Sequence, residues 1–402
     1  MTVSPAIWAL TIVVIVGLLA FDYFFHVRKA HVPTLKEAAI WSSIYVGLAV
    51  IFGLLVLWFG GVDMGSEYFA GYVTEKALSV DNLFVFLIIM ASFKVPREDQ
   101  QKVLLFGIVF ALITRTGFIF LGAAAINAYS WVFYIFGLVL LLTAGNMLRP
   151  ETEESHSADN FIIRIAKKVF HTTDYYDGDK LFTVVNGKRA LTPMLLVMVA
   201  IGGTDILFAL DSIPAIFGLT QNVFIVFTAT AFSLMGLRQL YFLLDGLLDR
   251  LIYLSYGLSA ILGFIGVKLI LHALHENNLP FVNDGEPVHV VEISTGLSLT
   301  VILGILIVTV IASLVSPAGK AQAAIGSARR HATQYVDLDY TADADERERI
   351  YQALRDEEEK VKALGPKYQK EAREQDELMD LIRRAHAQHE SFVKGEPPAK
   401  AP

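Results

Sequence analysis

Residues 205–220 read DILFALDSIPAIFGLT, an apolar segment that carries two aspartates six residues apart. Residues 75–86 read EKALSVDNLFVF and carry two acids at the same spacing. An ionised Asp at the centre of a bilayer costs at least about 2.5–3.5 kcal/mol, so acids in membrane helices are rare and mark functional sites. The two segments therefore predict membrane-spanning helices that hold a duplicated acidic site.

The rest of the chain has the composition of a polytopic membrane protein. Its 402 residues are 54% hydrophobic and 18% charged, whereas soluble domains are about 25% charged. A helix needs about 20 mostly apolar residues to cross a bilayer. We expect an all-α bundle of about nine transmembrane helices, at about 5–25, 41–59, 68–93, 103–125, 131–148, 193–218, 222–244, 251–274 and 294–315.

Positive charges in the connections predict the orientation, because Lys and Arg stay on the cytoplasmic side during insertion. They follow the first and third spans and recur between residues 149 and 192. The connections near 60–67, 126–130, 219–221 and 275–293 contain neither residue type. We therefore expect a multi-pass protein of the cytoplasmic (inner) membrane with its N-terminus outside and its C-terminus in the cytoplasm.

Two domains are expected, a transmembrane domain at 1–316 and a charged cytoplasmic tail at 317–402. The cytoplasmic loop at about 149–192 contains FIIRIAKKVF (161–170), which is apolar on one side and basic on the other and is predicted to lie on the membrane surface. It also contains FTVVNGKRAL (182–191), in which Asn-Gly between β-prone residues predicts a short hairpin.

The tail shows helical spacing of its apolar residues, at Ile350, Leu354, Val361 and Leu364. Gly365 and Pro366 end this pattern, and a second helix is expected from Lys367 to about Ser391. The PPAKAP ending is expected to be disordered, so that the tail is partly disordered. We interpret the tail as a solvated helical hairpin, with a specific docking arm as the alternative.

Composition excludes several classes of function. The chain has no cysteine, which rules out disulfides, thiolate metal sites and a Cys nucleophile. Its net charge is −7, so it has no electrostatic footprint for nucleic acid. We expect a protein that is not an enzyme and that has no prosthetic group.

The acidic segments belong to an internal repeat of three helices, the third to fifth and the sixth to eighth spans. The matched residues are Glu75 and Asp205, Asp81 and Asp211, Asn82 and Ser212, and Arg115 and Arg238. Because three is odd, the second copy enters the membrane from the opposite face. Such a 3+3 inverted repeat is typical of transporters, which place the substrate where the copies meet.

Oxygen ligands predict a cation site. Six residues rotate by about 240° around a regular helix, so a bend is needed to bring Asp205 and Asp211 together. Gly202-Gly203 and Pro214 are expected to provide it, and Pro214 leaves a carbonyl free near Asp211. Carboxylates with a free carbonyl suit Mg²⁺, Mn²⁺ or Ca²⁺ better than softer metals.

The charges leave an alternative open. Four acids face three cations, Lys76, Arg115 and Arg238, and the deficit grows if Lys76 reaches the outer interface. A divalent ion or protons would balance it. The alternative is that the acids only form buried ion pairs with the two arginines.

These motifs resemble the TerC/Alx family of bacterial integral membrane proteins, within the LysE-like transporter group. The similar segments are FDYFFHVRK (21–29), EKALSVDNLFVF, NGKRALTP, DSIPAIFGLT and GLRQLYFLL. The resemblance implies Mn²⁺ export and metal homeostasis, and for some members supply of metal to exported enzymes; the tellurium-resistance label describes a phenotype.

The resemblance also assigns residues. The acids would handle the transported metal with two neighbouring oxygen donors, namely Glu75, Asp81, Asn82, Asp205, Asp211 and Ser212. The charge count, and not the resemblance, makes Arg115 and Arg238 countercharges. The position of Asp22 near the inner end of the first span makes it a candidate for the cytoplasmic entrance, or a residue that only faces the headgroups beside Arg28. Many relatives have a Glu where this chain has Gly202, which leaves the ligand count and ion preference open.

Two other functions stay as alternatives. In the first, the protein is a membrane scaffold or metal-delivery partner, and its tail docks exported metalloenzymes or the secretion machinery. An intramembrane aspartyl protease would use two membrane aspartates, but such enzymes need Gly before one Asp, and Thr204 stands before Asp205. Weaker candidates at the outer end of the eighth span are His272, His275, Glu276 and His289, and the polar residues Asn146 and Lys268 match in the repeat.

Overall fold

The computed structural model describes residues 3–27, 35–93, 95–148, 180–185, 188–244, 251–280, 282–337, 344–369 and 376–394. The chain divides into two compact units, one formed by Met1–Asp245 with Ser255–Ile307 and the other by Gly246–Leu254 with Val308–Pro402. We describe each unit by itself.

The first unit is a bundle of apolar helices. Among the described residues, seven helices are long and apolar enough to cross a membrane. Its helices are α1 (Pro5–Asp22), α2 (Leu35–Ser92), α3 (Arg97–Ala128), α4 (Val132–Met147), α6 (Pro193–Phe217), α7 (Val223–Leu234), α8 (Leu237–Leu244), α9 (Leu254–His275) and α10 (Thr295–Val315). The boundary between the two units falls inside α10. A π-helical turn, Tyr23–Val27, continues α1, and a 3₁₀ turn, Asn283–Gly285, precedes α10.

Helix α2 is a hairpin of two antiparallel arms. Its backbone breaks at Gly61, where φ is +84°, a conformation that favours glycine. The arms pack on each other, since the Tyr68 hydroxyl donates to the Ala49 carbonyl at 3.0 Å and the Phe52 and Tyr68 rings lie 5.3 Å apart. With α2 counted as two arms and α4 as a shorter apolar helix, each of the nine expected stretches is helical, and the expected all-α membrane bundle is confirmed.

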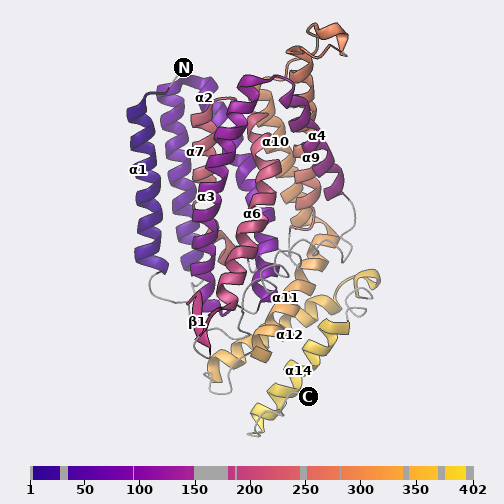
Figure 1. Cartoon of the computed structure of the whole chain (residues 1–402). Helices are drawn as coiled ribbons and strands as arrows, with labels where there is room; N and C mark the ends of the chain where they lie inside the picture. The colour runs from indigo at the N-terminus through magenta and orange to yellow at the C-terminus, as the bar shows by residue number, and fades with distance from the viewer. Residues whose placement is uncertain are drawn as a thin grey trace. The chain divides into compact units, whose positions relative to one another are not determined.

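The helices run lengthwise between two ends of this unit (Figure 1). The Gly61 end holds Gly61 and the starts of α1 and α10, and the hairpin end holds the strands β1 (Phe182–Val185) and β2 (Lys188–Leu191). The strands are antiparallel, with Phe182 opposite Leu191, as the sequence predicts. The predicted surface helix at 161–170 lies outside the described residues.

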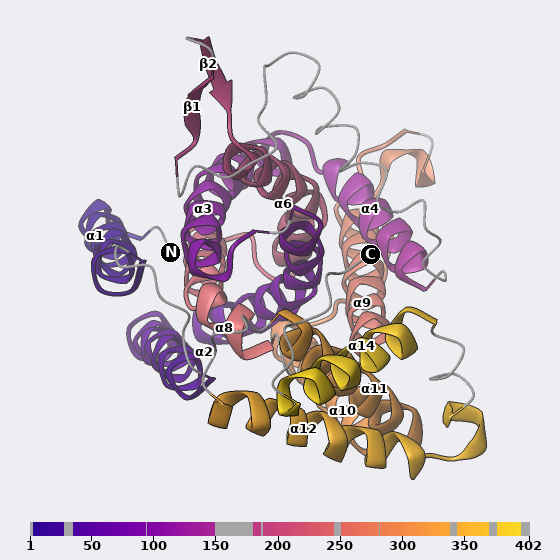
Figure 2. The same cartoon turned by 90° about the horizontal axis from the view of Figure 1, so that it is seen from below.

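The centre of this unit is made by α2, α3, α6 and α7, which Figure 2 shows in a view along the helices, with α1 at the edge and α4 beside α9. Small residues allow close packing here. A Cβ added at Gly107 of α3 would lie 2.9 Å from Ile201 of α6, and one at Gly202 would lie 3.0 Å from the Phe110 ring. Helices α3 and α6 therefore hold a fixed register across the buried interior.

Helix α6 runs from Pro193 to Phe217 as one helix with Pro214 inside it. The backbone of α6 therefore has no break between Asp205 and Asp211. In a regular helix these two acids point in different directions, whereas residues seven apart share a face.

Helices α7 and α8 are separated at Gly236, where φ is +73°. A Cβ there would lie 2.8 Å from Tyr45 of α2, so both the backbone and the available space require glycine. The break exposes the last carbonyls of α7 and places α8 against α2.

The second unit contains three tail helices, α11 (Pro317–Asp337), α12 (Ala344–Lys362) and α14 (Asp376–Val393). They share a small core made by Ala332, Tyr335, Leu354 and Ala385. The expected two-helix tail is therefore too simple, because α11 was not predicted. Helix α12 ends before Gly365 and Pro366, as predicted, and the PPAKAP ending lies outside the described residues.

This tail core predicts sensitivity to acid. Burial lowers the pKa of His389, which stacks on Tyr351 and meets the Tyr335 hydroxyl at 2.9 Å; Glu348, Arg347 and His386 also face it. The folded pKa lies below the unfolded value, so the stabilisation is complete above about pH 6.5 and is lost as pH falls toward the lowered pKa. We expect amide hydrogen exchange in α11 and α14 of the full chain, corrected for intrinsic rates, to be faster at pH 5.5 than at pH 7.5. His389→Gln should weaken this dependence, and equal protection at both pH values would contradict it.

Candidate metal-handling site

Arg115 of α3 is the centre of the acidic residues. Its side chain is fully buried. One guanidinium nitrogen, Nη2, donates to Asp205 Oδ1 at 2.9 Å, and Nη1 donates to Ser212 Oγ at 3.3 Å. Nη1 also forms an ion pair with Glu75 of α2. One arginine thus joins a residue of the first repeat to two of the second.

The helix geometry explains which oxygens meet. Asp205 and Ser212 are seven residues apart and lie two turns apart on one face of α6. That face packs against α3 and Arg115. Asp211 is one position off this face and is only partly buried. It nevertheless interacts electrostatically with Arg115 and with Asp81. Arg115 is therefore paired directly with Glu75 and Asp205, and Asp211 lies within the reach of its charge.

A small cavity lies beside the arginine. Its volume is about 10 Å³, and its polar lining is Ser79, Asn82, Arg115 and Asp205. That volume is about the minimum for one water-sized particle. Three buried oxygens here have no hydrogen-bond partner in the described part of the chain, namely Glu75 Oε2, Ser79 Oγ and Asp205 Oδ2. Unpaired oxygens are what a bound cation would satisfy.

The acids do not form a closed metal cage. Across the described ranges, no three His, Asp or Glu side chains converge closely enough to hold a metal ion. In this conformation Glu75 and Asp205 contact the guanidinium instead. A cation could reach them only if Arg115 moved.

Arg238 lies elsewhere, at the hairpin end, and does not face the four acids as expected. Its Nη2 and Nε donate to the two carboxylate oxygens of Asp22 at 2.7 and 3.1 Å, and Nη1 bonds Gln101. Asp22 also accepts from Gln239 Nε2 at 2.9 Å and from the Tyr45 hydroxyl at 3.1 Å. We call this buried network of five residues the Asp22 lock. It joins α1, α2, α3 and α8.

Lys76 follows Glu75 but points away from the acids. Its Nζ donates to the carbonyls of Ser233 and Met235 at 3.0 and 3.2 Å. These are carbonyls at the end of α7, which have no partner within that helix. Lys76 is therefore a buried cap, and the alternative in which it reaches the outer interface is wrong. Of the two expected countercharges, Arg115 pairs with Glu75 and Asp205, whereas Arg238 pairs with Asp22.

The comparisons with known proteins agree with this architecture. The profile of the integral membrane protein TerC family matches residues 60–321. The chain belongs to the TerC family. An uncharacterized membrane protein of Mycobacterium tuberculosis is 58% identical over 98% of this chain and 100% of its own length.

More distant TerC relatives cover most of the chain. A membrane protein of Myxococcus xanthus is 38% identical over 78% of this chain and 93% of its own. A protein of Escherichia coli that carries the name membrane-bound redox modulator Alx is 36% identical over 77% of this chain and 94% of its own. No solved structure matches significantly.

In this TerC protein the space beside residue 202, where the resemblance leads us to expect a Glu, is filled by packing. Gly202 is buried, and a Cβ there would lie 3.0–3.4 Å from three atoms of the Phe110 ring. A longer side chain at this position would have to displace that ring. The site therefore has the oxygens described above and no ligand from residue 202.

Sequence reasoning missed several polar residues of this TerC chain. Gln101, Gln239 and Tyr45 complete the Asp22 lock, and Ser79 lines the cavity. Ser79 follows Glu75 by four residues, which places both on one helix face and was a usable signal. Gln101 is far from Arg238 in sequence, and nothing in the local pattern joins them.

Proposed function

We propose that this TerC protein exports Mn²⁺ across the cytoplasmic membrane. The observation that carries the proposal is the pairing of buried Arg115 with Glu75 and Asp205, with the charge of Asp211 nearby and buried oxygens without partners beside it in the described part of the chain. Buried carboxylates are costly unless a cation compensates them. Transport explains why the chain keeps them in a bilayer.

The charge balance of the site favours a divalent cation as the transported ion. Four ionised acids carry −4, Arg115 supplies +1, and Lys76 is used as a helix cap. The remaining deficit is met by protons or by a metal ion that takes oxygen ligands. Carboxylate, hydroxyl and amide oxygens suit Mn²⁺, Mg²⁺ and Ca²⁺, and the family resemblance selects Mn²⁺.

Arg115 acts in this proposal as a tethered substitute for the cation. When no metal is present, its guanidinium neutralises Glu75 and Asp205. When Mn²⁺ enters, the guanidinium leaves these acids, and it returns when the ion departs. The acids then stay compensated through the cycle, which lowers the barrier to release.

We treat the two acid-bearing segments as copies of an inverted repeat, which leads to an alternating-access cycle. The second arm of α2 starts at the Gly61 end, whereas α6 starts at the hairpin end, so the two acid-bearing helices run in opposite directions. Arg115 sits where these copies meet, which is where transporters with inverted repeats bind substrate. By the charge rule for connections, we place the Gly61 end outside and the hairpin end in the cytoplasm.

Uptake of Mn²⁺ by inverted vesicles tests the proposal. Asp211→Asn should slow uptake by roughly tenfold or more, because mutating even the groups that surround the ligands of a metal site typically costs about 10–100-fold in metal affinity or activity. Glu286→Gln is the matched control, since Glu286 is an exposed acid in the connection before α10. Unchanged uptake in Asp211→Asn would sink the proposal.

The scaffold alternative predicts a different result. If the tail docks partner proteins and the body does not transport, removing residues 317–402 should abolish Mn²⁺ tolerance. We expect tolerance to survive, because no tail residue belongs to the acidic site. The redox role in the name of Alx could not use a thiol in this chain, which has no cysteine.

A further inference from the structure

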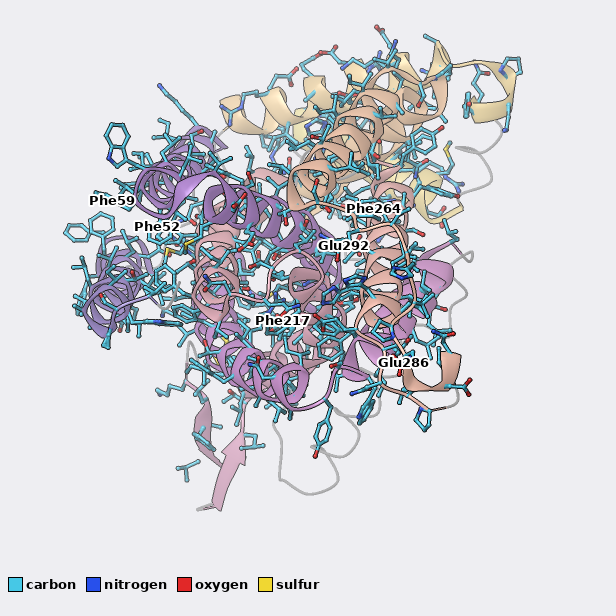
Figure 3. The ribbon with its side chains drawn as sticks, turned by 90° about the horizontal axis from the view of Figure 1, so that it is seen from above. Phe52, Phe59, Phe217, Phe264, Glu286 and Glu292 are labelled. Atoms are coloured by element: carbon cyan, nitrogen blue, oxygen red, sulfur yellow. The ribbon has the colours of Figure 1, made fainter. Side chains whose placement is uncertain are left out.

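A second polar pocket lies at the Gly61 end, where α6 ends and α10 begins. Its volume is about 360 Å³. Figure 3 views the molecule from this end, with Phe217, Glu286 and Glu292 labelled. The polar and charged side chains of this end pocket are Glu67, Thr220, Gln221, Lys268, His272 and Glu292. Neither the acidic repeat nor the TerC match assigns it a role.

The pocket holds charges of both signs. Glu67 Oε2 accepts the Thr220 hydroxyl at 2.6 Å, and Lys268 Nζ donates to Ser298 Oγ at 3.1 Å. The charges of Glu67 and Lys268 also interact across the pocket. Glu292 adds a second carboxylate at the exposed rim, where it pairs with His275 at 3.0 Å. The wall therefore carries two acids, one ammonium and a histidine.

The pocket lies at the end of α6, the helix that carries Asp205 and Ser212. Gly218 follows Ser212 by six residues, which is about 9 Å along α6. Phe217 stands between them, and its ring packs within 3.0 Å of a Cβ position at Gly122 of α3. Phe217, Gly218 and Glu67 all line the pocket, which therefore begins where the acid-bearing helix ends.

We propose that the end pocket is the release station for the transported divalent cation, with Glu67 as its ligand and Lys268 as the tethered charge that competes with it. This inference rests on the proposed function. Its physical logic repeats that of Arg115, since each station pairs acids with a built-in cation. The positive charge of Lys268 shortens the residence time of the cation in the pocket. The acidic rim attracts the cation toward the outside, because the connections at this end have no Lys or Arg.

Binding of Mn²⁺ to the purified full-length protein, followed by the EPR signal of free Mn²⁺, tests the release station. Lys268→Gln should tighten binding of one Mn²⁺ by about tenfold, because it removes a like charge from the site. Glu67→Gln/Lys268→Gln should lose that gain. Glu286→Gln, an acid at the same end but outside the pocket, should bind as wild type does.

Two outcomes separate this inference from the proposed function. If Lys268→Gln binds Mn²⁺ no more tightly than wild type, the release station is refuted, whatever Asp211→Asn does to transport. If the gain persists in Asp211→Asn/Lys268→Gln, the end pocket is a separate site. If transport in vesicles is unaffected by Asp211→Asn, the proposed function fails, and a gain from Lys268→Gln would then describe a surface site only.

Discussion

Replacing Arg115 by glutamine should abolish Mn²⁺ uptake in vesicles and lower the thermal stability of the purified protein. The change leaves Glu75 and Asp205 buried without their guanidinium partner. Removing one member of a buried ion pair commonly costs about 3–5 kcal/mol. Melting in detergent and vesicle uptake would measure the two losses.

The decisive result is the response of the Arg115→Gln protein to metal. If the guanidinium substitutes for the transported ion, added Mn²⁺ should occupy the vacated acids. A ligand that binds only the folded state stabilises it by an amount that grows with its concentration over Kd. We therefore expect Mn²⁺ to raise the Tm of Arg115→Gln by several degrees more than that of wild type.

Arg238→Gln is the matched control. It removes an equally buried arginine, but the buried partners that it leaves are a single acid, Asp22, and the neutral Gln101. We expect a similar loss of stability that Mn²⁺ does not restore. If Mn²⁺ stabilises wild type, Arg115→Gln and Arg238→Gln by the same amount, Arg115 is an ordinary ion-pair partner and the substitution idea is refuted.

The sequence predicts most of the membrane fold, because crossing a bilayer requires long apolar helices and leaves few alternatives. It predicts the β1–β2 hairpin from one Asn-Gly turn. It misses α11, whose buried face is mostly alanine and so has little hydrophobic contrast; the pattern is carried by Ala321, Ala324, Ala328 and Ala332. The helix was missed because its buried and exposed faces differ little in hydrophobicity, and not because the rule of helical spacing fails.

The site is predicted less completely. The acids and Arg115 come from the repeat, since a buried charge in a span needs a partner. Helix α6 runs unbroken through both aspartates, and Ser212, not Asp211, shares the face of Asp205. Arg238 matches Arg115 in sequence but contacts Asp22, because α1 lies outside the repeat and its position depends on tertiary packing. Long-range pairs such as Asp22–Arg238 leave no local pattern to read.

The Asp22 lock leads to the second large effect. Asp22 accepts hydrogen bonds from Arg238, Gln239 and Tyr45, so Asp22→Asn leaves a buried guanidinium without its acid. We expect a loss of about 3–5 kcal/mol by the same argument as for Arg115. Asp22→Asn/Arg238→Gln should recover part of it, because it removes both charges. A double-mutant cycle on Tm or denaturant midpoint would measure the coupling.

The same lock should control access to the acidic site from the hairpin end. The chain has no cysteine, so Ser79→Cys places a single thiol in the wall of the small cavity. With Asp22 present, a membrane-impermeant thiol reagent added at the hairpin end should label it slowly. In Asp22→Asn/Ser79→Cys we expect labelling at least about tenfold faster, because α1 and α8 are no longer joined. The transport cycle requires the hairpin end to open. The two proteins are compared at temperatures where their stabilities are equal. Equal labelling rates would then mean that the Asp22 lock only stabilises the fold and that access is controlled elsewhere.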